Sequence, residues 1–250
     1  CTGACRSRMT TAVLTRPLAD SQRLSRLLQD QSIPHITLPI LELTPLPESR
    51  CSPLPTISPG TIVIFVSANA VRWGLPELKV ALDQVDGCQV IAVGQKTRDT
   101  LATAGINAQI PERADSEGLL QMPALAAVER SHVLVVKGEG GRDLLGKELT
   151  ARGAHVIGWS CYRRVWPDVS LSALDAFAHN ALVFQASSGE VLSRLSELLA
   201  GADKKDLFQS TVIVPSDRVG ALAEQSGWRS VVRADDASDR GFIKALQSLQ

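Results

Sequence analysis

The chain has 250 residues, of which 44% are hydrophobic, and its 26 basic and 26 acidic residues give a formal net charge of zero. This length and content suffice for one large or two modest hydrophobic cores. The balanced charge argues against a nucleic-acid-binding protein, which would need a basic face. No apolar run is long enough to span a membrane, so we expect neither nucleic acid nor membrane as a partner.

Five cysteines and four histidines are scattered along the chain, with no C-x-x-C pair and no metal-ligand spacing. An odd number of scattered cysteines indicates reduced thiols, and no charged-then-apolar leader is visible. We therefore expect a cytoplasmic protein without a metal site. Residues 1–8 carry no fold signal, and we expect them to be an extension before Met9.

Short β-branched runs alternate with amphipathic helical patterns along the whole chain. Such alternation predicts parallel sheets with helices on both faces. The predicted strands cover residues 11–15, 36–41, 61–66, 90–93, 106–110, 133–136, 156–159, 181–184, 211–214 and 231–232. Helices are predicted after all of these except 36–41 and 156–159. Two Pro-containing segments, 45–60 and 167–170, are predicted linkers.

The stretch from Val133 to Pro167 is a compact strand–loop–helix–strand unit. Its loop, Lys137-Gly138-Glu139-Gly140-Gly141-Arg142, can turn sharply and expose amide N–H groups before a helix, which suits an anionic ligand. The loop lacks the Gly-Lys-Ser/Thr of a Walker A motif and departs from G-x-G-x-x-G at Asp143. An ordinary strand-to-helix turn remains the alternative. The unit ends near Tyr162, the only tyrosine in the chain.

Three strand–loop–helix units recur in the same order with a period of about 120 residues, which indicates two related domains. The pairs are 12–28 with 133–149, 63–75 with 182–195, and 90–105 with 212–227. Ligands of parallel sheets bind beyond the carboxyl ends of the strands. We therefore expect the six loops to line one cleft that holds a polyanion through hydroxyls, amides and a few arginines. Each Ser or Thr there has a helix N-cap as its alternative role.

The order and spacing of several motifs resemble the uroporphyrinogen-III synthase family of tetrapyrrole biosynthesis, from about Met9 to the C-terminus. The motifs are Leu14-Thr15-Arg16-Pro17, Phe65-Val66-Ser67-Ala68-Asn69-Ala70-Val71, Ala92-Val93-Gly94 with Thr97, Ser116-Glu117-Gly118-Leu119, Gly138-Glu139-Gly140-Gly141-Arg142, Gly153-Ala154 with Val156, Tyr162-Arg163-Arg164, and Pro215-Ser216 with Arg218. The chain departs from the pattern at Lys137, where arginine is common. It also carries Gln185-Ala186-Ser187 in place of a more usual Phe/Thr-Ser start.

The resemblance implies an α/β fold with two similar doubly wound parallel-sheet domains of the flavodoxin-like kind. A two-stranded connector would join them, and the chain would cross twice. Domain 1 would hold residues 9–42 and 168–250, and domain 2 residues 43–167. The linkers further predict rigid-body motion of the domains about residues 43–59 and 164–170, and the resemblance implies a monomer.

The resemblance also implies a lyase without cofactor, whose substrate is the linear tetrapyrrole hydroxymethylbilane. Its hydroxyl would leave, and the resulting cation would attack the substituted carbon of ring D. The spiro intermediate would reopen and reclose to uroporphyrinogen III with ring D inverted. Tyr162 would assist the leaving hydroxyl. The expected substrate contacts are Arg16, Ser67, Asn69, Thr97, Gly138, Arg142, Ser187, Ser216 and Arg218.

We also expect a transient hand-over of substrate from the preceding enzyme of the pathway. Two other classes of protein fit parts of the pattern. One is a non-enzymatic two-domain module that binds small anions, and the other is a flavodoxin-like or nucleotide-binding protein. The incomplete glycine fingerprint argues against a dinucleotide ligand, and a colourless preparation would argue against flavin.

Overall fold

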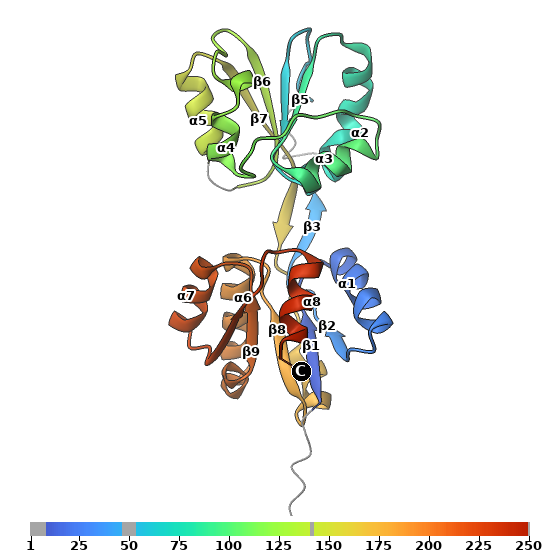
Figure 1. Ribbon diagram of the computed structural model, residues 1–250, viewed down its shortest axis with the longest axis vertical. Coiled ribbons are helices and arrows are strands. Elements are labelled where there is room, and N and C mark those ends of the chain that lie inside the picture. Colours follow the sequence, from blue (N-terminus) through green and yellow to red (C-terminus); the bar gives the residue numbers. More distant parts are fainter. Residues whose placement is uncertain (1–8, 47–53, 141–142, 250) are drawn as a thin grey trace, which may run out of the picture. The chain divides into compact units, whose positions relative to one another are not determined.

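A computed structural model describes residues 9–46, 54–140 and 143–249, and the chain divides into two compact units. Unit 1 ends at Glu42 and resumes at Val165, whereas unit 2 is the continuous stretch Leu43–Arg164. The chain therefore passes from one unit to the other twice (Figure 1). The predicted extension 1–8, part of the predicted Pro-rich linker and Arg142 lie outside the described residues.

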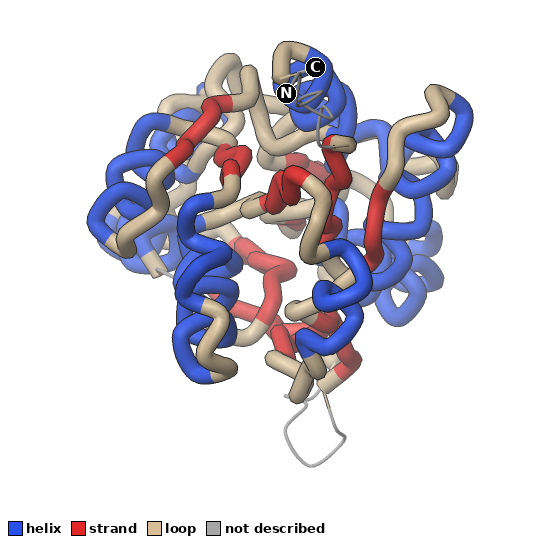
Figure 2. Tube along the Cα trace, turned by 90° about the horizontal axis from the view of Figure 1, so that it is seen from below, coloured by secondary structure: helices blue, strands red, loops and turns tan. Residues whose placement is uncertain are grey.

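Unit 1 contains a five-stranded sheet in the order β10-β9-β8-β1-β2, and all neighbouring strands are parallel. Helices lie on both sides of these strands (Figure 2). The strands are β1 (Thr10–Leu14), β2 (His35–Thr37), β8 (Ala181–Gln185), β9 (Thr211–Val214) and β10 (Ser230–Arg233). The helices are α1 (Leu18–Asp30), α6 (Gly189–Gly201), α7 (Asp217–Gln225) and α8 (Asp239–Gln247), with 3-10 segments η3 (Leu171–Phe177) and η4 (Lys205–Gln209).

Alternating side chains of the middle strand, β8, explain the two cores of unit 1. Phe184 points into a cluster with residues of α6 and α7, whereas Val183 joins a cluster with residues of α1 and α8. Successive side chains of a strand point to opposite faces of the sheet. A strand that is apolar at nearly every position therefore has to be covered by helices on both sides.

Unit 2 contains a second five-stranded sheet, in the order β3-β7-β6-β4-β5. Its strands are β3 (Glu42–Pro45), β4 (Ile62–Phe65), β5 (Gln89–Ala92), β6 (His132–Gly138) and β7 (His155–Val165). β5, β4, β6 and β7 are parallel, whereas the arrow of β3 points opposite to that of β7 (Figure 1). One face packs on α2 (Ala68–Gln84) and α3 (Gln95–Ala102), and the other on α4 (Ser116–Leu120) and α5 (Leu144–Ala151), near the 3-10 segment η2 (Pro123–Leu125).

The two sheets share one strand order. Counted along the chain, unit 1 has the flavodoxin-like order 2-1-3-4-5, and unit 2 has the same order when β3 is counted last. β1 therefore corresponds to β4, and β8 to β6. All three predicted pairings of strand–loop–helix units are wrong, because they matched β1 to β6, β4 to β8 and β5 to β9. Similar strand–loop–helix patterns occur in every βα unit, so local similarity could not set the alignment.

The predicted α/β class with parallel sheets is confirmed, but some strands differ from the prediction. The expected strand 106–110 is reduced to an isolated bridge between Ile91 and Gln109. The strand β3, which ends at Pro45, the first residue of the predicted linker, was missed because prolines lie near it. β3 lies at the edge of its sheet, where a proline such as Pro45 is tolerated. In the described part of the chain, no helix is long and apolar enough to cross a membrane.

Candidate functional site

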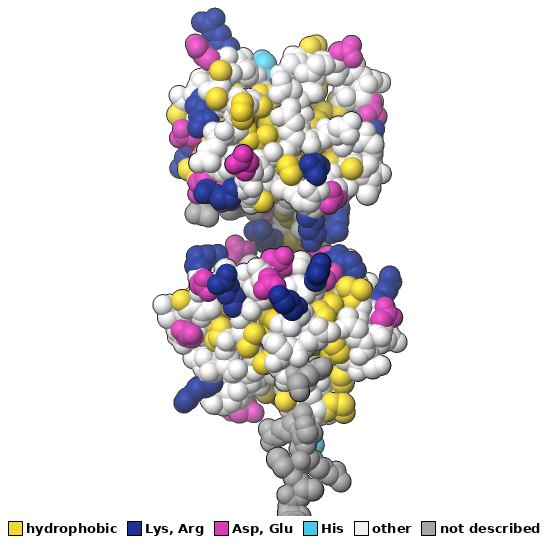
Figure 3. All heavy atoms as spheres, in the orientation of Figure 1, with side chains coloured by type: hydrophobic (Ala, Val, Ile, Leu, Met, Phe, Trp, Pro, Cys, Tyr) yellow, Lys and Arg dark blue, Asp and Glu magenta, His cyan; other side chains and the backbone are white. Residues whose placement is uncertain are grey.

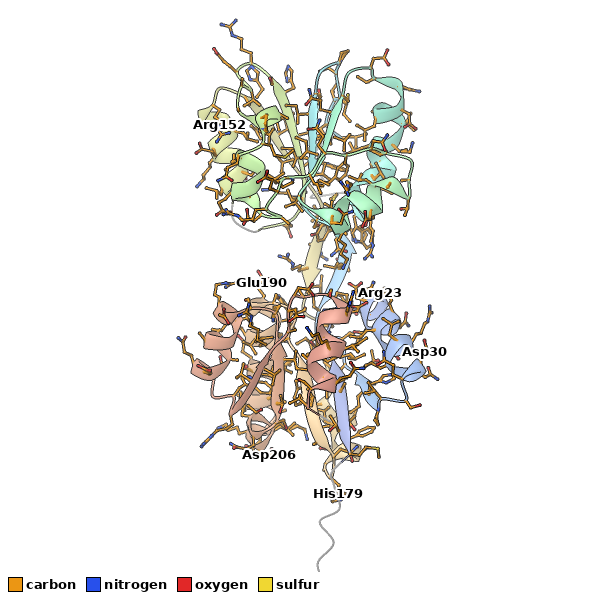
Figure 4. All side chains as sticks on the ribbon, viewed as in Figure 1. Arg23, Asp30, Arg152, His179, Glu190 and Asp206 are labelled. Carbon is orange, nitrogen blue, oxygen red and sulfur yellow. The ribbon has the colours of Figure 1, made fainter. Side chains whose placement is uncertain are left out.

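Every predicted site residue that the structure describes lies at the carboxyl edge of its own sheet or in the first turn of the helix that follows. Unit 1 carries Arg16, Ser187, Ser216 and Arg218, and unit 2 carries Ser67, Asn69, Thr97, Gly138 and Tyr162. Figure 4 marks this edge of unit 1 by Arg23 and Glu190, and the opposite edge by Asp206 and His179. Each group is described below within its own unit.

Tyr162, Ser67 and Gly138 form a cluster in unit 2. Tyr162 lies inside β7, not after a strand as predicted, and only 4% of it is exposed. Its hydroxyl lies 3.3 Å from Ser67 Oγ, and the backbone N–H of Glu139 donates to its carbonyl at 2.7 Å. Gly138 is its partner across the β6–β7 ladder, beside a β-bulge. A Cβ at Gly138 would come within 2.6 Å of the tyrosine ring, so the ring packs where only glycine leaves room.

Ser67 links this cluster to the start of a long helix. It is the N-cap of α2, and its Oγ accepts the backbone N–H of Ala70 at 2.9 Å. A serine hydroxyl has one proton and two lone pairs, so it can cap the helix and also share a hydrogen bond with the Tyr162 phenol. The N-cap role expected as the alternative for Ser67 is thus present together with a contact to another predicted site residue.

The other two candidates of unit 2 lie in the first turns of neighbouring helices. Asn69 is in α2, and its side-chain oxygen accepts a hydrogen bond from Arg72 at 3.3 Å on the protein surface. Thr97 is in α3, and only 4% of it is exposed. Both lie at helix N-termini, the kind of position at which anions bind, although the Thr97 N–H itself donates to the Gly94 carbonyl at 3.1 Å.

In unit 1, three candidates lie at the starts of α6 and α7. Ser187 immediately precedes Ser188, the N-cap of α6. Ser216 is itself the N-cap of α7, with its Oγ 3.5 Å from the backbone nitrogen of Val219. Arg218 is exposed, and its guanidinium lies beside Gly189, 3.8 Å from where a Cβ would be. Hydroxyls, helix N-termini and a cation thus lie close together.

Arg16 is buried and paired, which the sequence did not reveal. Its guanidinium donates to Asp239 at 2.5 Å and to the carbonyl of Ala237. Asp239 also binds Arg23 at 2.7 Å, and Arg23 in turn binds Asp20. Burial lowers the pKa of Arg16 despite these partners. Burial alone would raise the pKa of Asp239, but the hydrogen bonds and charges of Arg23 and Arg16 outweigh it and lower the pKa.

Around α8, acidic and basic side chains are intermixed on the surface (Figure 3). Asp235 and Lys244, for example, form an exposed ion pair at 2.7 Å. The charge of Arg16 is therefore compensated within unit 1. The sequence could not show this, because Arg16 and Asp239 are 223 positions apart.

A small pocket lies at the carboxyl edge of unit 1. It is lined by the ends of β8 and β9, by the loops that follow β1, β8, β9 and β10, and by α8. Its polar side chains include Arg16, Gln185, Ser187 and Asp236. Gln185 is a site candidate that the sequence reasoning did not select. A larger hollow, lined by Asn180 and Asp206 among others, lies at the opposite edge. We place the site at the carboxyl edge, because ligands of parallel sheets bind there and the candidates lie there.

The histidines, acids and cysteines of the described residues are the candidates for metal binding or thiol chemistry. No group of three His, Cys, Asp or Glu side chains in these residues could hold a metal ion. His132 and His155, scattered in the sequence, stack at 5.4 Å where β6 and β7 begin. Burial raises the pKa of the Cys161 thiol to about 12, so this thiol stays protonated at neutral pH. Weak hydrogen-bonding groups therefore dominate the site.

Comparison with known proteins identifies a matching family and several relatives of this chain. The family model described as uroporphyrinogen-III synthase HemD matches residues 22–244. The uroporphyrinogen-III synthase of Salmonella typhimurium is 32% identical over 205 residues, which covers 78% of this chain and 81% of that protein. The Escherichia coli protein of the same name is 29% identical over 244 residues, which covers 94% of this chain and 99% of that protein.

Solved structures agree on the fold. The uroporphyrinogen-III synthetase of Helicobacter pylori aligns with a TM-score of 0.60 and 17% identity, covering 97% of this chain and all of that one. A mutant uroporphyrinogen III synthase of Thermus thermophilus aligns with a TM-score of 0.57 and 17% identity, covering 96% and 99%. At this identity the match concerns the two-sheet α/β fold alone.

Proposed function

The chain belongs to the uroporphyrinogen-III synthase family, and from that premise we propose how its residues carry out the reaction. The protein is an enzyme of haem biosynthesis that acts on a small tetrapyrrole. In our proposal it is a cofactor-free lyase that closes hydroxymethylbilane to uroporphyrinogen III, with loss of water and inversion of ring D. The small-anion-binding module and the nucleotide-binding protein are the less supported functions.

The cluster of Tyr162, Ser67 and Gly138 is the observation that best supports this mechanism. In the proposal the Tyr162 phenol donates a hydrogen bond to the hydroxyl that leaves the substrate. Ser67 holds the phenol oxygen at 3.3 Å, and Gly138 leaves room for its ring. The pyrrole nitrogen drives departure of the hydroxyl, so a weak acid suffices.

The proposal assigns substrate contacts to each unit by itself. The contacts are Ser67, Asn69, Thr97, Gly138 and Arg142 from unit 2, and Arg16, Ser187, Ser216 and Arg218 from unit 1. Many modest hydrogen bonds share the binding, so loss of one should cost about 1–3 kcal/mol at most. Arg16 contributes least, because Asp239 already binds it. The protein then acts mainly by holding the chain so that the substituted carbon of ring D is nearest to the cation.

We further propose that the enzyme works in the cytoplasm as a monomer. It would receive its labile substrate by transient hand-over from the preceding enzyme, with neither nucleic acid nor membrane as a partner. The free thiols Cys88 and Cys161 support a reducing compartment. The hand-over can be tested by mixing the purified protein with the enzyme that makes hydroxymethylbilane. The measurement is whether an added carrier protein, which would capture free hydroxymethylbilane, slows formation of the product.

The direct test supplies hydroxymethylbilane and separates the cyclic isomers after oxidation. We expect substoichiometric protein to convert all the substrate to the isomer with ring D inverted, whereas a sample without protein closes without inversion. Multiple turnovers would exclude the binding module, which can at most trap one equivalent. Formation of only the uninverted isomer would contradict the proposal.

A further inference from the structure

The side chain of Gln185 is buried in unit 1 and has no hydrogen-bond partner among the described residues. Only 1% of Gln185 is exposed, yet neither Nε2 nor Oε1 is bound to another group. Its backbone is held firmly, because its carbonyl accepts a hydrogen bond from Thr15 Oγ1. Buried polar groups are almost always hydrogen-bonded, since leaving them unpaired costs free energy. A glutamine in this position therefore indicates a partner from outside the protein.

Gln185 occupies a central place at the carboxyl edge. It is the last residue of β8, the middle strand of the unit 1 sheet. Its neighbours Phe184 and Ala186 point into the core beneath α6 and α7. The alternation of the strand turns Gln185 to the other face, where it lines the small pocket together with Arg16 and Ser187.

The charged groups of this pocket are already engaged. Arg16 binds Asp239 and the carbonyl of Ala237. Asp236 accepts the backbone N–H of Ser238 at 2.8 Å, and the hydrogen bonds from Ser238 lower its pKa. The Gln185 amide is thus a neutral group whose donor and acceptor atoms are both buried and have no hydrogen-bond partner among the described residues.

We propose that Gln185 is a substrate-recognition residue, whose Nε2 donates to a carboxylate arm of the tetrapyrrole while Oε1 accepts a pyrrole N–H. This inference rests on the proposed function. A carboxamide needs an acceptor and a donor together, and a tetrapyrrole offers both. A fully ionised anion such as sulfate offers only acceptor oxygens, which can satisfy Nε2 but repel Oε1. The amide therefore selects a pyrrole carrying an acidic arm over a simple anion.

The Gln185→Met variant tests this role, because methionine keeps the length of the side chain and removes both polar atoms. We expect the KM for hydroxymethylbilane to rise about 10- to 100-fold, as for loss of hydrogen bonds to charged or desolvated groups. The kcat should change little, because the amide binds substrate and transition state alike. The thermal midpoint of the free enzyme should stay the same or rise, since an unpaired buried amide has been removed.

Gln209→Met is the matched control, because Gln209 is an exposed glutamine at the opposite edge of the same unit. Its KM should equal that of the wild type. If Gln185→Met does not show the circular dichroism spectrum of the folded protein, Gln185→Leu serves as a second variant. Sodium sulfate is the anion probe, and we expect it to protect wild type and Gln185→Met equally against heat.

The change in KM decides the outcome. An unchanged KM in folded Gln185→Met would overturn the inference. If the thermal midpoint of this variant were also lowered, a buried water would be the partner of the amide in the free enzyme. Stronger protection of the wild type by sulfate would also overturn it, because an anion with acceptor oxygens alone would then suffice. Failure of the wild type to form uroporphyrinogen III would instead refute the proposed function, so the two failures are distinguishable.

Discussion

At the scale of single residues, uncharged groups hold the Tyr162 side chain and backbone in place. A hydroxyl, a glycine and a backbone N–H surround it: Ser67 Oγ at 3.3 Å, the open face of Gly138, and the amide of Glu139. These contacts limit the rotation of a ring that is otherwise packed in the apolar core of unit 2. Orientation of this kind is what a cyclisation requires of its enzyme.

Tyr162→Phe removes the hydroxyl and keeps the ring. We expect turnover to fall roughly 10²-fold, at the low end of general-acid assistance, because the substrate itself drives part of the reaction. The thermal midpoint should change little, since the ring still fills its place. Steady-state kinetics and a melting curve check both expectations. Wild-type turnover in the Phe variant would make Tyr162 a structural residue, and the proton would then come from water or a substrate carboxylic acid.

Gly138→Ala should displace the tyrosine ring, because its Cβ would come within 2.6 Å of that ring. Overpacking of a core costs about 1–3 kcal/mol of stability, and turnover should fall as well, because the phenol leaves Ser67. Gly201→Ala is the control: a Cβ there meets no atom within 4 Å. The control should be neutral or slightly stabilising. Equal activity of Gly138→Ala and wild type would show that catalysis does not require glycine at position 138.

At the scale of elements, serines and an acid fasten the helices to the carboxyl edges of the sheets. Ser67, Ser188, Ser216 and Ser238 each accept a backbone N–H in the first turn of their helices. Asp239, the first residue of α8, goes further and ties that helix to Arg16 after β1 and to Arg23 on α1. One carboxylate therefore ties α8 to the loop after β1 and to α1, in addition to the apolar packing of Phe242, Ile243 and Leu246.

Asp239→Asn should destabilise unit 1 by about 2–4 kcal/mol at pH 7, because it leaves the buried guanidinium of Arg16 without a counter-charge. The folded pKa of Asp239 lies below its unfolded value. Its contribution is therefore complete above the unfolded pKa, near about 4, and is lost as the pH falls through the folded pKa. Between pH 5 and 2, the unfolding free energy should drop more steeply in the wild type than in the variant.

Asp235→Asn is the matched control for this experiment. Its ion pair with Lys244 has side chains that are 68% and 71% exposed, and exposed pairs contribute little to stability. Denaturant titrations at each pH measure both variants. Identical pH dependence of wild type and Asp239→Asn would show that the Arg16 pair does not stabilise the fold.

At the scale of the whole molecule, each unit has apolar cores on both faces of its own sheet. Unit 2 is also continuous in sequence. We therefore expect a fragment of residues 43–164 to fold by itself and to unfold cooperatively in a calorimeter. The same fragment with Phe65→Ala, which empties a fully buried position, should lose about 3–5 kcal/mol. An unstructured wild-type fragment would show that unit 2 needs unit 1 to fold.

The sequence by itself determined the alternation of strands and helices, the parallel α/β class and the family. These depend on local signals. β-branched runs such as Val133–Val136, helix-starting serines such as Ser67, and glycine stops such as Gly105, at φ 76°, act over a few residues. The order of short motifs along the chain carried the family resemblance, which needs no knowledge of contacts. The site residues were located at strand ends for the same reason.

Only the tertiary structure decided which distant residues meet. It matched β1 to β4, placed β3 beside β7, paired Arg16 with Asp239 and buried the Gln185 amide. Ser67 and Tyr162 are 95 positions apart, and Arg16 and Asp239 are 223 apart. Any of several βα units could have supplied such partners with the same local pattern. The choice among them follows from packing two helical layers on each sheet, a condition that involves the whole unit at once.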